Sequence, residues 1–468
     1  MSTAADLEAE TRQTIDELLR ERMREDGVPG LSLVVVDGED VSYATGYGSR
    51  DLASNEPATA ETVYGIGSVS KSFASLAVLQ LVDRGRLSVE DSVTEHLDVD
   101  VPEEVTLHHL LTHTSGYPSL AASEALIARQ MEIGEAGVPL GSMDDVYAHI
   151  EGAREEIAGE PGERWAYCNS GYTLLGAVVE AVTGLGYSEY VEREILGPLE
   201  MERSTFDRET FESFEDRMTP YFPDPDGGGG DANASADGRD RNLTDFPLPI
   251  REQSAAAGGL LAPVSDLANY VRLHLSGGEF EGRRLVSGET LERAYGAYAD
   301  TPSGPYGYGW RTRDVAGHEL IGHGGSIAVS TAYLGFSPEE HVGFALLANA
   351  GPGYGLAELG KGVFAALVGE DPETLPFFEQ KRRFEELTGE YETYRGIKRG
   401  TVQAEGGTLR LRVGGPISGG EWTTLIPRDV SEGEYYTLTA AGEEQEVRFV
   451  RDGGDLSLYV DRWRLHKQ

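Results

Sequence analysis

Cysteine and long apolar runs are nearly absent from this chain. Its 468 residues include one cysteine, Cys168, which excludes an intrachain disulfide and a zinc site built from cysteines. No run of about 18 apolar residues occurs, so we expect no membrane span. Residues 1–25 are charged and lack the apolar core of a signal peptide, and we therefore expect a cytoplasmic protein.

Positive charge is also scarce. The chain has 39 basic and 80 acidic residues, for a formal net charge of −41. Such a charge argues against binding to nucleic acids or to an anionic membrane surface. An acidic surface with few lysines is typical of adaptation to high salt, where screening shortens the range of self-repulsion. We therefore hypothesise a halophilic source and a small-molecule substrate.

Apolar residues make up 39% of the chain, enough for a globular α/β or α+β protein. Their spacing predicts a helix over residues 5–25, strands over 31–36 and 41–47, another buried strand over 341–349 and a helix over 355–368. Residues 223–243 are polar, glycine-rich and of low complexity, which predicts a mobile surface insertion.

The pattern changes near residue 370. Short alternating runs follow, separated by glycine turns, at 408–413, 435–438, 446–450 and 456–460. Alternation with tight turns predicts an all-β meander or barrel. We therefore predict one domain over residues 1–370 and a second, all-β domain over 371–468.

The most informative stretch is Gly67–Lys71, followed by an apolar helical run over 72–82. Ser68 and Lys71 are three residues apart, so they share one helix face. Lys71 is the only lysine among the first 360 residues. A buried lysine can lose its proton near neutral pH and act as a base, whereas arginine cannot. The alternative is an ordinary solvated helix start, so the pair needs partners elsewhere in the chain.

Two later stretches offer such partners. Tyr167 and Asn169, two apart on an extended segment, would present a phenol and an amide to one cavity. They could instead pack a ring and cap a helix. In His323–Ser326, two glycines at a strand start would allow close approach of a substrate, although an ordinary turn has the same pattern.

Histidines gather at His108, His109 and His113. Three histidines within six residues could suggest a metal, but no carboxylate lies at ligand spacing in that segment. We therefore expect neither a metal nor another cofactor.

Taken in order, Ser68-x-x-Lys71, Tyr167-x-Asn169 and His323-x-Gly325 resemble the serine β-lactamase and penicillin-binding-protein superfamily. The resemblance is to its class C-like branch, which includes esterases and D-amino-acid-specific peptidases, and it covers residues 10–368. It implies an α/β (α+β) domain with an antiparallel sheet beside a helical part, the site lying between them. The small β domain would be an accessory domain, and homo-oligomerisation stays open.

The resemblance also implies roles. Ser68 would be the acylated nucleophile and Lys71 its general base or proton relay. Tyr167 would protonate the leaving group and activate the deacylating water, while Asn169 would hold Lys71 and a substrate amide. The expected activity is a serine hydrolase acting on esters or small peptides and amides.

The third motif departs from the pattern. Its relatives usually have Lys-Ser/Thr-Gly there, and His323 replaces that lysine. His323 would line the cleft edge, and the N–H groups of Ser68 and Ser326 would form the oxyanion hole beside Gly325. Without the lysine, we expect poor binding of anionic β-lactams. A β-lactamase, a D-Ala-D-Ala carboxypeptidase and a catalytically silent scaffold are the alternatives. Cys168, beside the site, is expected to be accessible to thiol reagents.

Overall fold

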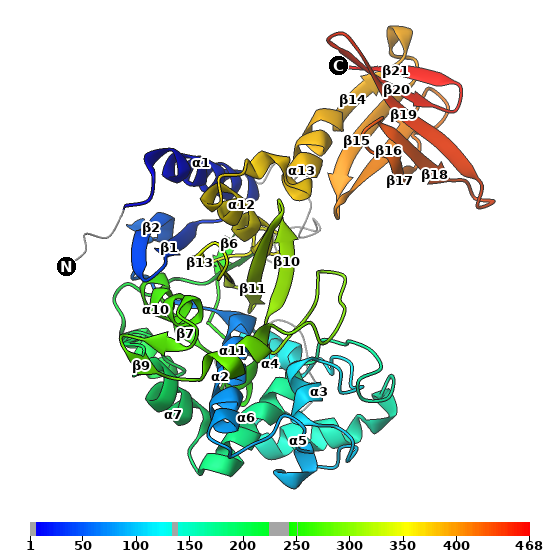
Figure 1. The fold of residues 1–468 in the computed structure, drawn as a ribbon. Helices are drawn as coiled ribbons and strands as arrows, with labels where there is room; N and C mark the ends of the chain where they lie inside the picture. The colour runs from blue at the N-terminus through cyan, green and yellow to red at the C-terminus, as the bar shows by residue number, and fades with distance from the viewer. Residues whose placement is uncertain (1–5, 133–138, 224–242, 250) are drawn as a thin grey trace. The chain divides into compact units, whose positions relative to one another are not determined.

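The computed structural model describes residues 6–132, 139–223, 243–249 and 251–468 (Figure 1). The described chain divides into two compact units, the first ending at Pro372 and the second beginning at Glu373. Most of the stretch for which we predicted a mobile insertion, residues 224–242, lies outside the described residues.

A seven-stranded antiparallel sheet forms the centre of the first unit. Its strand order is β10-β11-β12-β13-β1-β2-β3. Pairing of β13 with β1, in register Val34 to Ala345, joins the end of this unit to its beginning. The strands are β1 (Gly30–Asp37), β2 (Asp40–Asp51), β3 (Glu56–Pro57), β10 (Arg311–Val315), β11 (His318–Ser326), β12 (Thr331–Ser337) and β13 (Val342–Ala348).

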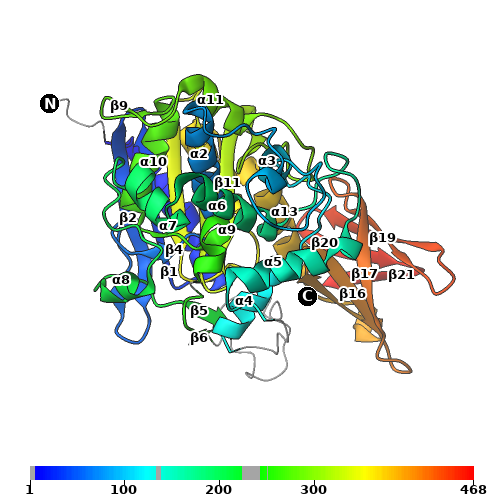
Figure 2. The same ribbon diagram turned by 90° about the horizontal axis from the view of Figure 1, so that it is seen from below.

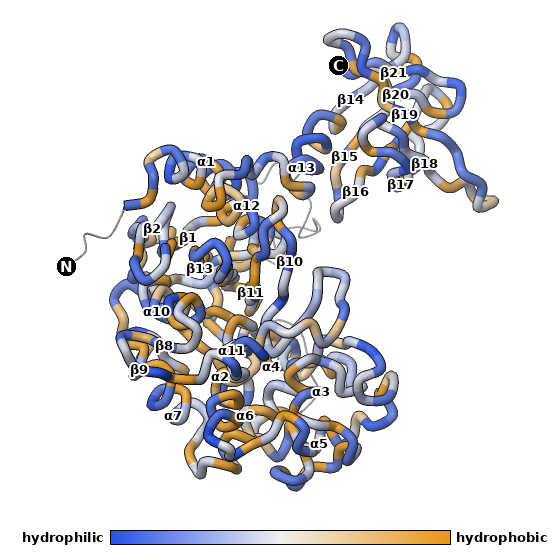
Figure 3. The backbone as a smooth tube through the Cα atoms, in the orientation of Figure 1, coloured by the Kyte–Doolittle hydropathy of each residue, from blue (hydrophilic) through white to orange (hydrophobic). Residues whose placement is uncertain are grey.

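Helices cover both faces of this sheet. α1 (Ala9–Asp26) packs on α12 (Ala357–Leu367), which lies on β12 and β13, whereas α10 (Val264–Leu275) contacts β13, β1 and β12. Both faces of β12 are buried because the sheet is covered on both sides, so β12 is apolar along most of its length. Orange, hydrophobic residues accordingly make up much of α12, which packs on the sheet, in Figure 3.

A helical part lies beside the sheet. Its central helix, α2 (Ser70–Asp83), is buried over almost all of its length and packs on α6 (Asn169–Thr183) and α9 (Ala255–Gly258), as Figure 2 shows. The other helices of this unit are α3 (Leu107–Leu111), α4 (Ala122–Gln130), α5 (Met143–Gly152), α7 (Tyr187–Val191), α8 (Arg208–Ser213) and α11 (Gly288–Glu292).

Short two-stranded pairs complete the first unit. They are β4 (Tyr64–Gly65) with β7 (Leu261–Ala262), β5 (Tyr221–Pro223) with β6 (Leu243–Asp245), and β8 (Glu279–Phe280) with β9 (Arg283–Arg284). The sheet, its flanking helices and the helical part confirm the predicted fold class.

The second unit is a closed barrel that follows helix α13 (Pro376–Leu387). Strands pair in chain order, and pairing of β14 with β21, Tyr391 opposite Lys467, closes the ring. Alternate side chains such as Val402, Leu411 and Val447 fill its interior. Of the two predicted alternatives, the barrel is confirmed. Its strands are β14 (Gly389–Glu392), β15 (Arg399–Glu405), β16 (Thr408–Gly414), β17 (Trp422–Asp429), β18 (Glu434–Leu438), β19 (Glu444–Asp452), β20 (Asp455–Val460) and β21 (Trp463–Lys467).

Candidate active site

Ser68 lies in a single 3₁₀ turn, Gly67–Val69, that leads directly into α2. Gly67 has φ +52°, in the left-handed region, and a Cβ at this position would lie 2.5 Å from the backbone nitrogen of Ser326. Only glycine fits without strain, so the turn presses Ser68 against the end of β11. Lys71 follows one turn later, with Nζ 3.1 Å from Ser68 Oγ.

The amine of Lys71 is fully buried and has three oxygen neighbours. Besides Ser68, Nζ donates to Asn169 Oδ1 at 2.7 Å and to the carbonyl oxygen of Ala257 at 2.6 Å. Burial lowers the pKa of Lys71 from 10.5 to about 7. A neutral amine keeps two hydrogens, which satisfy Asn169 and Ala257, and its lone pair then faces the Ser68 hydroxyl. The geometry therefore suits proton uptake from Ser68.

Tyr167 also lies close to the Lys71 amine. Its ring centroid lies 4.9 Å from Lys71 Nζ. Burial raises the pKa of Tyr167, although an interaction with the Ser68 hydroxyl lowers it in part. The side chain is therefore a phenol, not a phenolate, at neutral pH, and it can donate a proton.

His323, the first residue of the third motif, is buried. Its Nδ1–H donates to the carbonyl oxygen of Gly324 at 2.7 Å, and its Nε2 accepts from the Tyr306 hydroxyl at 3.1 Å. Burial, followed by the charges of Lys71 and Arg311, lowers the pKa of His323 to about 3, so the imidazole is neutral. Both ring nitrogens are engaged within the protein, and His323 is not among the residues that line the pocket at Ser68.

The end of β11 supplies backbone N–H groups. Ile327 N–H donates to Ser330 O across the turn, so the preceding pair, Ser326 with Thr331, is a non-hydrogen-bonded pair. Ser326 N–H thus points away from β12, toward the β10 side of β11. Pairing with β10 ends at Gly322, so β10 does not occupy the space next to Ser326. A Cβ on Gly325 would overlap the carbonyl oxygen of Ile66 and lie 2.9 Å from Ser68 N. The N–H groups of Ser326 and Ser68 therefore border the same space.

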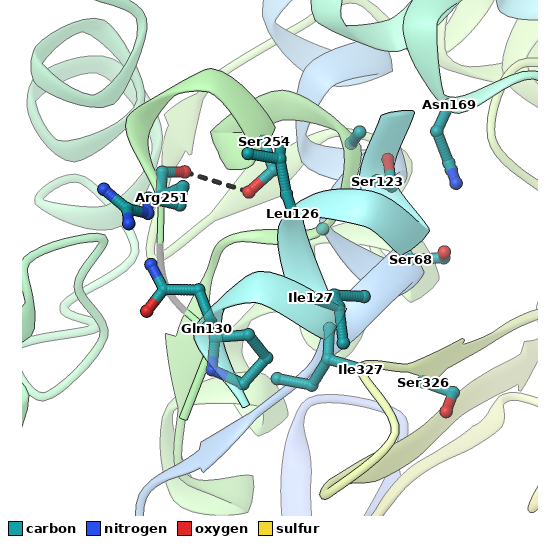
Figure 4. A pocket seen from close by; sticks show the side chains of 13 residues that line it. Ser68, Ser123, Leu126, Ile127, Gln130, Asn169, Arg251, Ser254, Ser326 and Ile327 are labelled. Carbon is teal, nitrogen blue, oxygen red and sulfur yellow. Dashed lines mark hydrogen bonds between the residues drawn. The ribbon is translucent and has the colours of Figure 1, made fainter. Parts of the chain in front are cut away.

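A pocket opens beside Ser68 (Figure 4). α4 forms one wall with Leu126 and Ile127, and Ile327, after β11, lines the pocket as well. Ser68 and Ser326 line the same pocket, while Arg251 stands at its exposed edge. Tyr167 is not part of the lining. The space next to the hydroxyl thus has apolar side chains among polar ones in its lining, and Tyr167 does not border it.

The structure brings together Ser68, Lys71, Tyr167 and Asn169, from two segments about 100 residues apart. Sequence reasoning missed the carbonyl of Ala257, because a backbone contact leaves no residue signature. It also missed Arg311, whose guanidinium lies 5.0 Å from the ring of Trp165 and 4.9 Å from that of Tyr306.

The prediction for Cys168 was wrong. The thiol is buried, and burial raises its pKa. Cys168 immediately precedes α6. Its side chain points into the core, whereas that of the neighbouring Asn169 points toward Lys71.

Among the residues that the structure describes, no group of three or more histidine, cysteine, aspartate or glutamate side chains is arranged to hold a metal ion. No helix formed by them is both long and apolar enough to cross a membrane.

Known proteins with related sequences match most of this chain. Protein flp of Staphylococcus aureus (strain MW2) is 26% identical over 362 residues, which cover 74% of this chain and 64% of that protein. The chain thus matches less than two thirds of that relative. Penicillin-binding protein 4 of Amycolatopsis lactamdurans is 27% identical over 347 residues, 69% of this chain and 81% of that protein.

Solved structures extend the similarity to both units. The octameric penicillin-binding protein homologue from Pyrococcus abyssi superposes with a TM-score of 0.88 at 34% identity, covering 97% of this chain and 100% of that one. A class C β-lactamase shares the fold over 77% of this chain and 96% of that one, with a TM-score of 0.62 at 18% identity.

Two family models match the chain, and the boundary between them lies close to the boundary between the two structural units. Residues 372–466 match the Pab87 octamerisation domain, and residues 15–363 match the β-lactamase model. Because the second of these matches spans well over half of the 468 residues, the chain belongs to the β-lactamase family.

Proposed function

We propose that this protein is a serine hydrolase that forms an acyl-enzyme on Ser68 and hydrolyses esters or small peptide and amide substrates. The observation that carries the proposal is the buried amine of Lys71, with a pKa near 7, placed 3.1 Å from the Ser68 hydroxyl. A base with this pKa is matched to work at neutral pH.

In acylation, the neutral amine of Lys71 takes the proton of Ser68 as Oγ attacks the substrate carbonyl carbon. The N–H groups of Ser68 and Ser326 stabilise the oxyanion. As the bond to the leaving group breaks, the phenol of Tyr167 gives that group its proton. The acyl-enzyme is left with a protonated Lys71 and a phenolate at Tyr167.

Deacylation reverses these transfers. The Tyr167 phenolate accepts a proton from water, whose oxygen attacks the acyl carbonyl. When the bond to Oγ breaks, the ammonium of Lys71 returns the proton to Ser68. Each group regains its starting state, and the net change is hydrolysis.

The pocket beside Ser68 supports a substrate with an apolar acyl group. The phenol serves the leaving group, so the acyl half occupies the space that Tyr167 does not line. Ser123, Ile127 and Gln130 on α4 follow helical spacing and extend about 10 Å from the first to the last. An acyl chain of several carbons therefore fits along Ile127 and Ile327.

The experiment is mass spectrometry after a fluorophosphonate or penicillin probe, with Ser68→Ala and Lys71→Arg as variants. We expect one adduct on the Ser68 peptide of the wild type and none in S68A. K71R keeps the positive charge but cannot act as a base, so we expect at most a trace of adduct. Absence of the wild-type adduct, or undiminished ester turnover in S68A, would refute the proposal and favour a silent scaffold.

Substrate class is tested with a p-nitrophenyl ester series, a D-alanyl anilide and a chromogenic cephalosporin, in molar KCl. With the leaving group held constant, kcat/KM is expected to rise with acyl length up to several carbons. Ile127→Trp is expected to move the optimum to shorter acyl groups, whereas Val41→Trp, in the β1–β2 hairpin, is the control. Turnover of the cephalosporin above that of the esters would favour a β-lactamase.

We also propose that the chain forms a homo-oligomer through its second unit. Support comes from the match to an octamerisation domain, from the octameric relative and from exposed apolar side chains on the barrel, including Ile417 and Leu438. Light scattering on the full chain tests this. Eight copies of the 50.6-kDa chain would weigh about 400 kDa, and a monomer would contradict the proposal.

A further inference from the structure

His113 has an unusual place near the proposed site. It follows α3 in a buried segment, and its backbone has φ +59°, which is rare for a residue with a side chain. Such strained backbone persists where the surroundings hold it, and it gathers at functional sites. The proposed function assigns His113 no role.

His113 holds both neighbours of Tyr167. Its carbonyl oxygen accepts the N–H of Ala166 at 2.8 Å, and its ring Nδ1 accepts the N–H of Cys168 at 3.1 Å. Two hydrogen bonds accepted by one residue thus fix the backbone N–H groups of the residues on either side of Tyr167. The imidazole fills the space between them, with its centroid 4.2 Å from that of the Tyr167 ring.

The tautomer of His113 follows from these contacts. Because Nδ1 accepts a hydrogen bond, the proton of the neutral ring is on Nε2. This buried Nε2 has no hydrogen-bond partner in the described structure. It is surrounded by aromatic rings instead, since the centroids of Tyr172 and Tyr306 each lie 5.1 Å away. A buried donor without a partner is unfavourable, so stability alone does not explain a histidine at this position.

We propose that His113 is a positioning residue that holds the phenol of Tyr167 in line with the leaving group. The inference rests on the proposed function, because it assigns the phenol the transfer of a proton during acylation. His113 touches neither substrate nor Ser68. It acts through the peptide groups of residues 166 and 168 and through ring contact with Tyr167.

The test exploits the chemistry of the leaving group. A p-nitrophenolate leaves without being protonated, whereas an alkoxide or an anilide needs the proton that Tyr167 supplies. A misplaced phenol therefore slows acylation by an alkyl ester or anilide far more than acylation by the p-nitrophenyl ester of the same acid. General loss of structure slows both substrates equally.

The variants are His113→Phe, which keeps a ring but loses the acceptor, and His113→Asn. The Asn amide oxygen takes the place of Nδ1, and Asn tolerates a positive φ. Tyr167→Phe provides the benchmark. His274→Phe is the matched control, since His274 is also buried among rings with an unpartnered Nε2 but contacts Tyr270, Trp310 and Phe336 instead.

We expect H113F to lower kcat/KM about 10²-fold for the alkyl ester or anilide and less than about tenfold for the p-nitrophenyl ester. KM should change little, and H113N should recover most of the loss. All rates are normalised to active sites titrated with a fluorophosphonate, so that poorly folded protein does not count.

Equal losses on both substrates, or H113N as impaired as H113F, would overturn the inference. So would the same selective loss in H274F. If Y167F shows the selective loss and H113F does not, only the role of His113 fails. If the wild type forms no adduct on Ser68, the proposed function itself fails. Should H113F yield too little folded protein to titrate, H113N is compared with His113→Gln, whose oxygen lies near the Nε2 position and not near Nδ1.

Discussion

The amine of Lys71 lies 2.7 Å from the amide oxygen of Asn169, although 98 residues separate them in the chain. This contact joins the start of α2 to the start of α6. It gives the amine a neutral partner, so burial alone sets the direction of the pKa shift. A carboxylate in place of the amide would stabilise the ammonium instead.

Asn169→Asp is therefore expected to raise the pKa of Lys71. In the wild type, kcat/KM for a neutral ester should rise with pH and level off above about 7, where the amine is neutral. In N169D this limb should move to higher pH by about one unit or more, since an adjacent opposite charge favours the charged form. A pH–rate profile measures the shift. Asn269→Asp, on α10, is the control, and an unmoved limb in N169D would contradict the assignment of Lys71 as base.

Replacement of the amine itself gives a second prediction, on stability. The pKa of Lys71 is about 7 in the folded chain and 10.5 ordinarily. Between these values the unfolded chain binds a proton that the folded chain has released, so the wild type gains stability as pH rises. The unfolding free energy of Lys71→Met minus that of the wild type should therefore fall by about 1.4 kcal/mol per pH unit.

Urea unfolding at several pH values from about 7 to about 10 measures that difference. Titrations of all other groups are shared by the two proteins and cancel. Lys361→Met removes a partly exposed lysine on α12 and serves as the control. A difference for K71M that stays constant with pH would mean that the amine is not desolvated in the folded state.

Gly325 and Gly324 are adjacent on β11 but differ in the space around them. A Cβ on Gly325 would overlap Ile66 O and crowd Ser68 N, whereas one on Gly324 would have its nearest neighbours at 3.8 Å. Gly325→Ala should displace β11 from the Ser68 turn, disturb both oxyanion donors and lower kcat 10²-fold or more, about the effect of losing one donor.

Gly324→Ala should keep activity within a few fold. Both variants are compared by ester hydrolysis and by thermal unfolding. Similar activity in G325A and G324A would show that the N–H groups of Ser68 and Ser326 do not need this close approach.

The net negative charge predicts that the stability of the folded chain depends on salt concentration. With a net charge of −41, the folded chain repels itself, and at molar salt the screening length falls to about 3 Å. We expect the midpoint of thermal unfolding to rise between low and molar KCl. Glycerol at matched viscosity is the control. A midpoint that does not rise would argue against adaptation to high salt.

Local sequence was enough to predict the helices and strands whose residue pattern repeats over a few positions. One helical turn places Ser68 beside Lys71 independently of the rest of the chain. Lys71 is also the only lysine among the first 360 residues, which singled out its amine as a candidate base. Alternation after residue 400 likewise determines strands, because one side of each strand must be buried. The order of the three motifs along the chain then indicated the family, and with it the sheet and the helical part.

Tertiary structure alone decided where the side chains around Ser68 and Lys71 point. Asn169 meets Lys71, His323 turns to Tyr306, and Cys168 is buried, because packing against distant segments selects among rotamers that local sequence leaves equivalent. The same holds for closure of the barrel, which depends on pairing between its first and last strands. Periodicity determines the secondary structure of a segment and the face on which each of its residues lies. Long-range contacts determine which groups meet to form a site.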